Sequence, residues 1–249
     1  MDLNLNSFYK KNPNQTEYKT IDFNKIFRIF IKDEIMKYYY FLIPIFIGIV
    51  AGSFLVLYQP QSVDSKILTQ SNLIENGSPV LGDSNAPITI LEWGDYQCTY
   101  CYKFHQETLD IINENFIQTG KVKVIFKDFP LNGPDSKLGA QASYCANDQE
   151  KYWQYHDELY KNWGGERTGW ITRDSLTEFA KEIQLDINEF NNCLDENKYE
   201  NKINKIYDFG KEIGIDATPS FLVFNNENII KIRGNQPLEV FLKTFDELR

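Results

Sequence analysis

The stretch Ile88-Thr-Ile-Leu-Glu-Trp-Gly-Asp-Tyr-Gln-Cys98-Thr-Tyr-Cys101 joins an apolar strand pattern to a helical pattern and places two cysteines at the junction. At a helix N-terminus, Cys98 would meet unpaired backbone N–H groups and the positive end of the helix dipole. Both favour the thiolate, so Cys98 is expected to be acidic and reactive. Cys101 follows one turn later on the same face, within reach of a mixed disulfide at Cys98. The spacing therefore indicates thiol–disulfide exchange.

Two other uses of a Cys-x-x-Cys pair fit this sequence less well. A closed zinc site needs two further ligands, but Cys145 and Cys193 form no second knuckle, and His105 would supply only a third ligand. A structural disulfide between Cys98 and Cys101 would close so short a loop that it removes little entropy from the unfolded chain. We therefore predict a redox pair and no metal site.

The composition is that of a globular protein with a substantial core. The chain has 249 residues, 42% of them hydrophobic and 15% aromatic, which allows one large domain or two small ones. Its net charge of −9 is unsuited to binding a phosphate backbone, so no nucleic-acid partner is expected. The sequence contains neither a GxGxxG motif nor a P-loop, and we expect no cofactor.

An uncharged stretch near the N-terminus predicts one transmembrane helix. Residues 38–58 carry no charge, are long enough to cross a bilayer, and have tyrosines at both ends, as aromatic belts do. A buried core helix and a cleaved signal peptide are the alternatives, but both usually have shorter apolar runs. Residues 1–37 are polar and predict a cytoplasmic tail, either disordered or an amphipathic helix at the membrane surface. We favour an uncleaved signal-anchor in the lipid bilayer.

The flanking charges predict the orientation of this segment. The N-terminal side carries more basic residues than the C-terminal side, where Lys66 stands alone within about 20 residues. By the positive-inside rule the N-terminus is cytoplasmic, and everything after residue 58 is extracytoplasmic at the cell membrane. Disulfides persist outside the cytosol, which agrees with the cysteine motif. Residues 59–79 are polar and predict a flexible linker. The basic residues on the N-terminal side are Lys19, Lys25, Arg28, Lys32 and Lys37.

Glu92 is the unusual residue of the strand before the cysteines. Residues 88–94 are apolar on both faces, which is typical of a central strand covered on both sides. Glu92 is then a carboxyl at a core-facing position, where burial is costly. A salt-bridged or strand-end glutamate is the alternative. Because Glu92 stands at the base of the turn, we predict that it accepts the proton of Cys101.

The remaining patterns give an α/β order. Residues 121–126 alternate as a second strand, and residues 135–213 are helical throughout, with five amphipathic stretches. Strand patterns return at 220–224 and 229–232 as a hairpin, followed by a closing helix over 237–248. The order is βαβ, a helical block, then ββα.

Three stretches resemble the DsbA-like branch of the thioredoxin superfamily. The first is Gly82 to Ile90 followed by Asp95-Tyr-Gln-Cys98-x-x-Cys101, the second is Tyr152 to Tyr160, and the third is Gly214 to Phe221. Together they cover about residues 79–249 in the right order. The resemblance implies a thioredoxin-like domain made of residues 80–134 and 214–249. Residues 135–213 would be an inserted all-helical domain.

The same resemblance assigns roles to individual residues. It implies Cys98 as nucleophile, Cys101 as resolving cysteine and Glu92 as the buried acid. A cis bond between Thr218 and Pro219 would lie beside them, where its backbone pairs with an extended substrate. The implied partners are cysteine-containing exported proteins and a membrane redox partner that resets the cysteine pair.

Some relatives carry a second bridge, and two further cysteines suit one. Cys145 and Cys193 each lie on the apolar stripe of a different insert helix. Outside the cytosol we expect them to form a structural disulfide. Two free buried cysteines are the alternative.

The dipeptide between the redox cysteines, Thr99 and Tyr100, departs from the family pattern because it brings no positive charge near Cys98. We predict a membrane-anchored, extracytoplasmic thiol–disulfide oxidoreductase, foremost a disulfide-forming oxidase. The alternatives are a reductase or isomerase of the same fold, a tethered copper- or zinc-handling protein, and a binding module that has lost activity. We expect His105 at the solvent side or in helix packing, and Asp95 and Tyr96 shaping the approach to Cys98.

Overall fold

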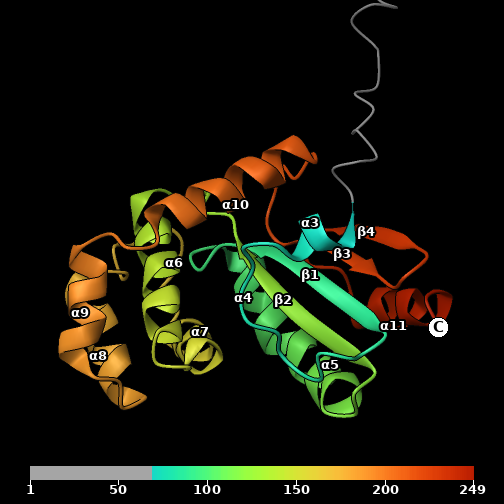
Figure 1. The fold of residues 1–249 in the computed structure, drawn as a ribbon, viewed down its shortest axis with the longest axis horizontal. Coiled ribbons are helices and arrows are strands. Elements are labelled where there is room, and N and C mark those ends of the chain that lie inside the picture. The colour runs from blue at the N-terminus through green and yellow to red at the C-terminus, as the bar shows by residue number, and fades with distance from the viewer. Residues whose placement is uncertain (1–68) are drawn as a thin grey trace, which may run out of the picture. The chain divides into compact units, whose positions relative to one another are not determined.

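The computed structural model describes residues 69–249, which form a four-stranded mixed sheet with a block of helices beside it (Figure 1). The strand order is β2-β1-β3-β4. β1 (Ile88–Gly94) runs parallel to β2 (Val122–Asp128) and antiparallel to β3 (Ser220–Phe224), which pairs with antiparallel β4 (Ile229–Arg233). This is the thioredoxin-like α/β fold predicted from the βαβ and ββα patterns.

β1 is central and buried along its whole length, as its pattern predicted. Ile88 and Ile90 pack against the helix that follows the cysteines and against α11 (Leu238–Glu247). Leu91 and Trp93 belong to a second cluster on the opposite face of the sheet. Because side chains alternate along a strand, Glu92 shares the face of Ile88 and Ile90 and points toward the helix that carries the cysteines.

The helix after the cysteines is interrupted by two π-helical segments. α4 (Thr99–Phe104) continues into η1 (His105–Leu109), α5 (Asp110–Ile112) and η2 (Asn113–Ile117). A π turn holds an extra residue, so it rotates the side chains that follow relative to an α-helix. His105, at the first residue of η1, is only 5% exposed. Our expectation that His105 lies at the solvent side was therefore wrong, whereas helix packing was right.

Five helices lie between β2 and β3, matching the five amphipathic stretches. Thr172 caps α8 through a hydrogen bond from the Ser175 N–H, and Asp186 caps α9 through one from the Glu189 N–H. In Figure 1, α10 runs as a long orange helix from this block back toward the sheet. The five helices are α6 (Pro134–Asn147), α7 (Tyr152–Lys161), α8 (Arg173–Glu182), α9 (Ile187–Asp195) and α10 (Glu200–Glu212).

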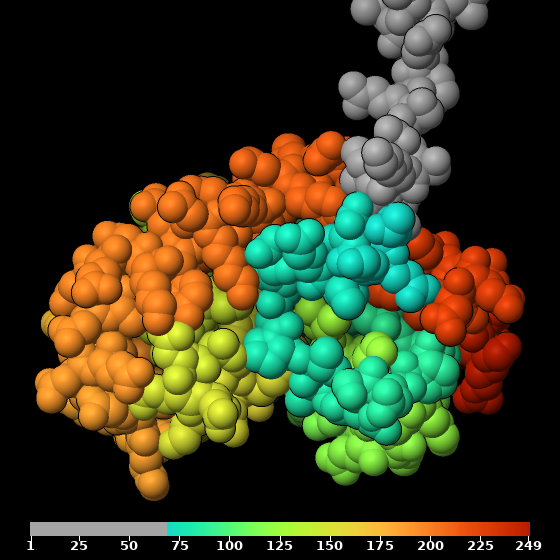
Figure 2. Space-filling view, viewed as in Figure 1, coloured from blue at the N-terminus to red at the C-terminus, as the bar shows by residue number. Residues whose placement is uncertain are grey.

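Residues 69–79 are folded against the sheet and do not continue the predicted flexible linker. The short helix α3 (Gln70–Ile74) buries Leu73 completely in the cluster around Trp93. The Ser78 N–H then donates to the Phe126 carbonyl at 2.9 Å, along the outer edge of β2. In Figure 2 this cyan segment adjoins the orange surface of α10. The burial of Leu73 and the hydrogen bond at the edge of β2 therefore hold residues 69–79 in place, although this stretch is polar in sequence.

The predicted transmembrane helix at residues 38–58 and the tail before it lie outside the described residues. Within residues 69–249, no helix combines the length and the apolar character needed to cross a bilayer.

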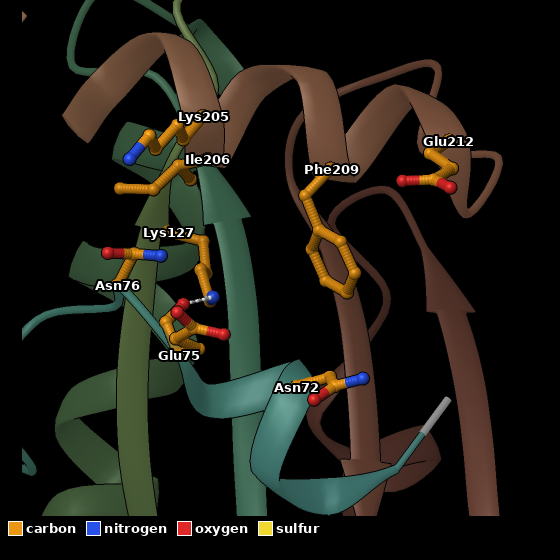
Figure 3. Close-up of a pocket in the computed structure, with 8 residues that line it drawn as sticks. All are labelled: Asn72, Glu75, Asn76, Lys127, Lys205, Ile206, Phe209 and Glu212. Atoms are coloured by element: carbon orange, nitrogen blue, oxygen red, sulfur yellow. Dashed lines mark hydrogen bonds between the residues drawn. The ribbon is translucent and has the colours of Figure 1, made fainter. Parts of the chain in front are cut away.

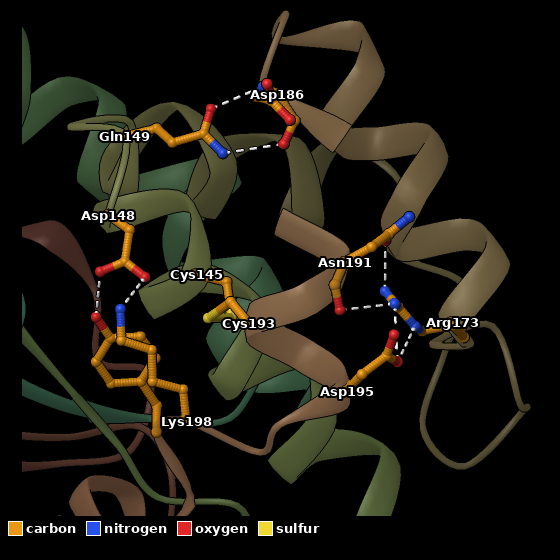
Figure 4. Close-up of a disulfide and its surroundings, with 10 residues drawn as sticks. Cys145, Asp148, Gln149, Arg173, Asp186, Asn191, Cys193, Asp195 and Lys198 are labelled. Carbon is orange, nitrogen blue, oxygen red and sulfur yellow. Dashed lines mark hydrogen bonds and ion pairs between the residues drawn. A yellow bond between two sulfur atoms is a disulfide. The ribbon is translucent and has the colours of Figure 1, made fainter. Parts of the chain in front are cut away.

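Cys145 of α6 and Cys193 of α9 form a disulfide, as expected (Figure 4). Ion pairs lie near the bridge and involve the neighbouring α8 and the turn after α9. Lys198 pairs with Asp148 at 2.8 Å, and Arg173 of α8 pairs with Asp195 of α9 at 2.9 Å. Because the two cysteines are 48 residues apart, the bridge closes a long loop in the unfolded chain.

Removing this bridge should destabilise the protein. We expect the double variant Cys145→Ala/Cys193→Ala to lose about 2–4 kcal/mol of unfolding free energy, because its unfolded chain regains the entropy of the open loop. Urea denaturation followed by circular dichroism measures this loss. Thiol counting on the unreduced, unfolded parent protein is the control, and a reactive Cys145 or Cys193 there would contradict the bridge.

Candidate active site

Cys98 and Cys101 are both free thiols at the start of α4. Cys98 is the N-cap residue and has extended backbone angles, while its carbonyl accepts the Tyr102 N–H at 3.0 Å. Cys101 lies one turn later and is completely buried, whereas Cys98 keeps 5% of its surface exposed. The pair is therefore asymmetric, and only Cys98 can be reached by another thiol or disulfide.

The surroundings separate the two cysteines in acidity. A hydrogen bond with Cys101 is the main cause that lowers the pKa of Cys98 to about 7, and hydrogen bonds with Thr218 and with the backbone of Cys101 and Tyr100 act in the same direction. Burial opposes this shift. Burial is also the main cause that raises the pKa of Cys101 well above its usual value, and Cys98 and Glu92 add to it. Near neutral pH, Cys98 is therefore the more readily ionised thiol, whereas Cys101 holds its proton.

The loop before β3 lies directly beside Cys98. The Thr218–Pro219 peptide bond is cis, and the Sγ of Cys98 lies 3.4 Å from the Thr218 carbonyl oxygen. Ser220 pairs with Trp93 in the sheet, which holds the loop against the end of β1. The structure thus brings together the redox cysteines and the predicted substrate-docking residues Thr218 and Pro219.

Asp95 and Gln97 hold the turn that carries Cys98. The Asp95 carboxylate accepts hydrogen bonds from the Gln97 N–H at 2.8 Å and from the backbone of Leu131 and Asn132 at 2.7 and 2.8 Å. The buried Gln97 side chain donates to Ser136 Oγ at 2.9 Å. These contacts stiffen the turn from below, so the position of Cys98 does not depend on the short helix α4 alone.

A loop of the helical insert reaches the same turn, and no motif in the sequence points to this contact. The Glu166 carboxylate accepts the Thr99 N–H at 2.9 Å, and the Arg167 N–H donates to the Gln97 side-chain oxygen at 2.9 Å. Thr99 is the first residue of α4, immediately after Cys98. Glu166 therefore places a carboxylate at the N-terminus of α4, next to Cys98 in the chain.

Glu92 lies beneath the cysteine pair with no exposed surface. Neither carboxylate oxygen has a hydrogen-bond partner within the described part of the chain. His105 Nε2 lies 3.6 Å from Glu92 Oε2. Asp95 and Tyr96 are buried as well, and they bond to the turn and to His156, so our expectation that they shape the approach to Cys98 was wrong.

Two hollows in the surface of residues 69–249 are lined by residues other than the cysteines. One has a volume of about 290 Å³ and lies between α3, β2 and α10 (Figure 3). In Figure 3 the Lys127 ammonium meets the main-chain oxygen of Glu75, and burial lowers the pKa of this lysine to about 8. This contact connects the end of α3 to β2, and no cysteine lines this hollow. Across residues 69–249, no three His, Cys, Asp or Glu side chains are grouped so that they could hold a metal ion.

Comparison with known proteins points to the same chemistry. A sequence profile described as thioredoxin matches residues 75–246. The chain is 33% identical over 150 residues to a probable disulfide bond formation protein D of Bacillus cereus, covering 59% of this chain and 69% of that protein. It is 31% identical over 158 residues to disulfide bond formation protein D of Bacillus subtilis, covering 62% and 70% of the two chains.

Solved structures agree with the sequence relatives. Oxidised BdbD of Bacillus subtilis superposes with a TM-score of 0.62 at 27% identity, covering 70% of this chain and 93% of that one. α-DsbA1 of Wolbachia pipientis gives 0.61 at 29% identity, covering 70% and 91%. An accessible acidic cysteine, a buried partner and a neighbouring cis-proline loop are the parts that disulfide exchange requires. The chain therefore belongs to the thioredoxin family and is a DsbA-like protein thiol–disulfide oxidoreductase.

Proposed function

We propose that this protein is a membrane-anchored, extracytoplasmic oxidase that forms disulfides in exported proteins through the pair Cys98-Thr-Tyr-Cys101. The observation that carries the proposal is the opposite acidity of the two cysteines beside the Thr218–Pro219 loop. A stabilised Cys98 thiolate favours the reduced form of the pair, and a pair that prefers to be reduced takes electrons from its substrates.

The reaction proceeds through a mixed disulfide. A substrate thiolate attacks Cys98 of the oxidised pair, the Cys98–Cys101 bond breaks, and Cys101 leaves as a thiolate that takes up a proton. A second thiolate of the substrate then attacks the substrate sulfur that is bonded to Cys98. This forms the substrate disulfide and releases Cys98 as a thiolate. The substrate loses two electrons and gains a disulfide, and the pair becomes a dithiol. Glu92, beneath Cys101, supplies the proton, and the Thr218–Pro219 loop holds the substrate backbone.

The location outside the cytosol is supported by the sequence before residue 69. Residues 38–58 carry no charge and have a basic cytoplasmic flank. A membrane redox partner would then reoxidise the pair after each turnover, and cysteine-containing exported proteins would be its substrates. The disulfide between Cys145 and Cys193 agrees with an oxidising compartment.

Glu166 favours a second candidate, a reductase or isomerase. Its carboxylate occupies the Thr99 N–H, one of the donors at the N-terminus of α4. A negative charge there opposes a thiolate at Cys98, and Tyr100 brings no positive charge to compensate. A less stabilised thiolate makes the pair less oxidising. The direction of electron flow thus depends on the balance between Cys101, which favours the Cys98 thiolate, and Glu166, which opposes it.

The first test concerns the chemistry. The oxidised full chain should oxidise a reduced test protein, and Cys98→Ser should abolish this because no sulfur remains for the first attack. Gel electrophoresis without reductant follows the reaction. Reduced Cys101→Ser is the matched variant: it should capture a disulfide substrate as a persistent mixed disulfide at Cys98, because the resolving thiol is missing. Unchanged oxidation by Cys98→Ser would overturn the proposal.

The second test concerns the anchor. In cells that produce the full chain, the protein should stay in the membrane pellet after an alkaline carbonate wash, because an apolar helix is held by the bilayer core. A variant that lacks residues 38–58 is the control and should appear in the wash. Release of the full chain by carbonate would contradict a transmembrane anchor.

The third test concerns the acidity of Cys98. The rate of Cys98 alkylation should rise with pH with a midpoint near 7, since only the thiolate reacts. Glu166→Gln keeps an acceptor for the Thr99 N–H and removes the charge, so it should lower this midpoint. The reduced pair should then gain about twofold in its equilibrium with glutathione, the size of a helix-terminus charge effect.

A glutamate far from α4 provides the control for this charge. Glu178→Gln removes an exposed carboxylate that pairs with Lys181 on α8, and it should leave both measurements unchanged. If Glu166→Gln leaves the alkylation midpoint of Cys98 unchanged, the charge of Glu166 does not oppose the Cys98 thiolate.

A further inference from the structure

A string of buried polar side chains leads from Glu92 into the contact between the sheet domain and the helical insert. Glu92 Oε2 lies 3.6 Å from His105 Nε2, and the same nitrogen lies 3.3 Å from His156 Nε2. His156 Nδ1 lies 2.8 Å from the Tyr96 hydroxyl, which accepts a hydrogen bond from Ser143 Oγ at 2.8 Å. The two histidines of the chain thus meet beneath the redox pair.

The hydrogen bonds of this string are satisfied by the following arrangement of protons. With the Ser143 hydroxyl donating to Tyr96 at 2.8 Å rather than to the Gly139 carbonyl at 3.3 Å, the Tyr96 O–H donates to His156 Nδ1. His156 then carries its proton on Nε2 and donates it toward His105 Nε2. His105 in turn carries its proton on Nδ1, and its Nε2 lone pair lies between His156 and Glu92. A proton placed on Glu92 therefore has a basic nitrogen beside it.

Groups from β1 and α7 surround His105. Glu92 comes from β1, and α7 contributes His156 and Tyr160, whose ring stacks on His105 at 4.0 Å between centroids. Cys101 lies four residues earlier on the same helix as His105, and the exposed Asp157 of α7 interacts with His105 electrostatically. On the apolar side, Phe104 and Phe126 contact the His105 ring edge to face.

His156 is suited to hold the tautomer of His105. Burial first, and the neighbouring His105 second, lower the pKa of His156 well below its usual value. His156 therefore stays neutral at physiological pH, with one nitrogen that accepts and one that donates. Tyr96 interacts with the buried carboxyl of Asp128 and with Tyr152 on its other side, so the string borders a second buried acid.

We propose that His105 shares with Glu92 the proton exchanged with Cys101, and that His156 and Tyr96 are positioning residues that present the His105 Nε2 lone pair to Glu92. This inference rests on the proposed function, because it deepens the part played by Glu92 in the cysteine chemistry.

The step is clearest in the reducing direction. Cys98, bonded to a substrate sulfur, is attacked by Cys101, whose thiol proton passes to Glu92 and is shared with His105 Nε2. The Cys98–Cys101 bond forms, the bond from Cys98 to the substrate breaks, and the substrate leaves as a thiolate. The pair loses the two electrons that the substrate disulfide gains. The oxidising direction is the reverse, with the shared proton returned to Cys101.

A matched pair of tyrosines tests the string without changing its shape. Tyr96 and Tyr160 are both 1% exposed, and their rings lie 5.3 Å apart. The Tyr96 hydroxyl bonds to His156, whereas the Tyr160 hydroxyl has no hydrogen-bond partner within residues 69–249. Each Tyr→Phe change removes one oxygen, but only Tyr96→Phe breaks the string.

The experiment is a stopped-flow single turnover of the reduced full chain with a fluorescent peptide disulfide. The first phase reports attack by Cys98, and the second reports release of the remaining peptide by Cys101. His105→Gln should slow the second phase about tenfold near pH 7 and change its dependence on pH, because the group that shares the proton with Glu92 is lost. Tyr96→Phe should slow it about threefold and shift that dependence. Tyr160→Phe should match the parent protein in both phases.

The outcomes separate this inference from the proposed function. If the parent protein shows no first phase, Cys98 does not act on disulfides and the proposed function fails. If both phases occur and His105→Gln or Tyr96→Phe keeps the second-phase rate and pH profile of the parent, His105 and its string play no part. Equal slowing by Tyr96→Phe and Tyr160→Phe would also overturn the inference, because a loss of packing would then explain both.

Discussion

The burial of the Glu92 carboxyl in the central strand is the constraint on which the site depends. A charged carboxylate without partners is expensive inside a protein, by several kcal/mol even after relaxation. Here both oxygens lack a hydrogen bond within the described residues, and the only basic group close by is His105 at 3.6 Å. Such a group is retained where a proton must be taken up and released. The redox cysteines stand directly above it, where a proton moves each time the disulfide opens or closes.

The two cysteines lie in one short turn, but their pKa values are shifted in opposite directions. Cys98 sits at the edge of α4, where hydrogen bonds lower the pKa of its thiol to about 7. Cys101 is turned inward, and burial raises the pKa of its thiol. This division fixes the order of events, because the accessible sulfur is charged and the buried one must exchange a proton. The tight bonding of Asp95 and Gln97 under the turn keeps the two environments distinct.

The sequence predicts the fold well where one periodic pattern decides it. β1 is apolar on both faces and is central, and the five helical stripes of the insert each form a helix. The cysteine pair was found from its spacing at a strand–helix junction, whereas the Thr218–Pro219 loop was found only through the family resemblance. The contacts of His105 were missed because its partner His156 is 51 residues away and belongs to the helical insert. α3 was missed because a single buried leucine anchors an otherwise polar helix.

The helical insert contacts the surroundings of both cysteines. Its loop brings Glu166 to the Thr99 N–H, next to Cys98 in the chain. Its helix α7 brings His156 against His105, which lies 3.6 Å from Glu92. In the proposed mechanism, the first contact opposes the negative charge of Cys98, and the second orients the group that shares a proton with Glu92. A shift of the insert against the sheet would then alter the acidity of Cys98 and the proton transfer of Cys101 together.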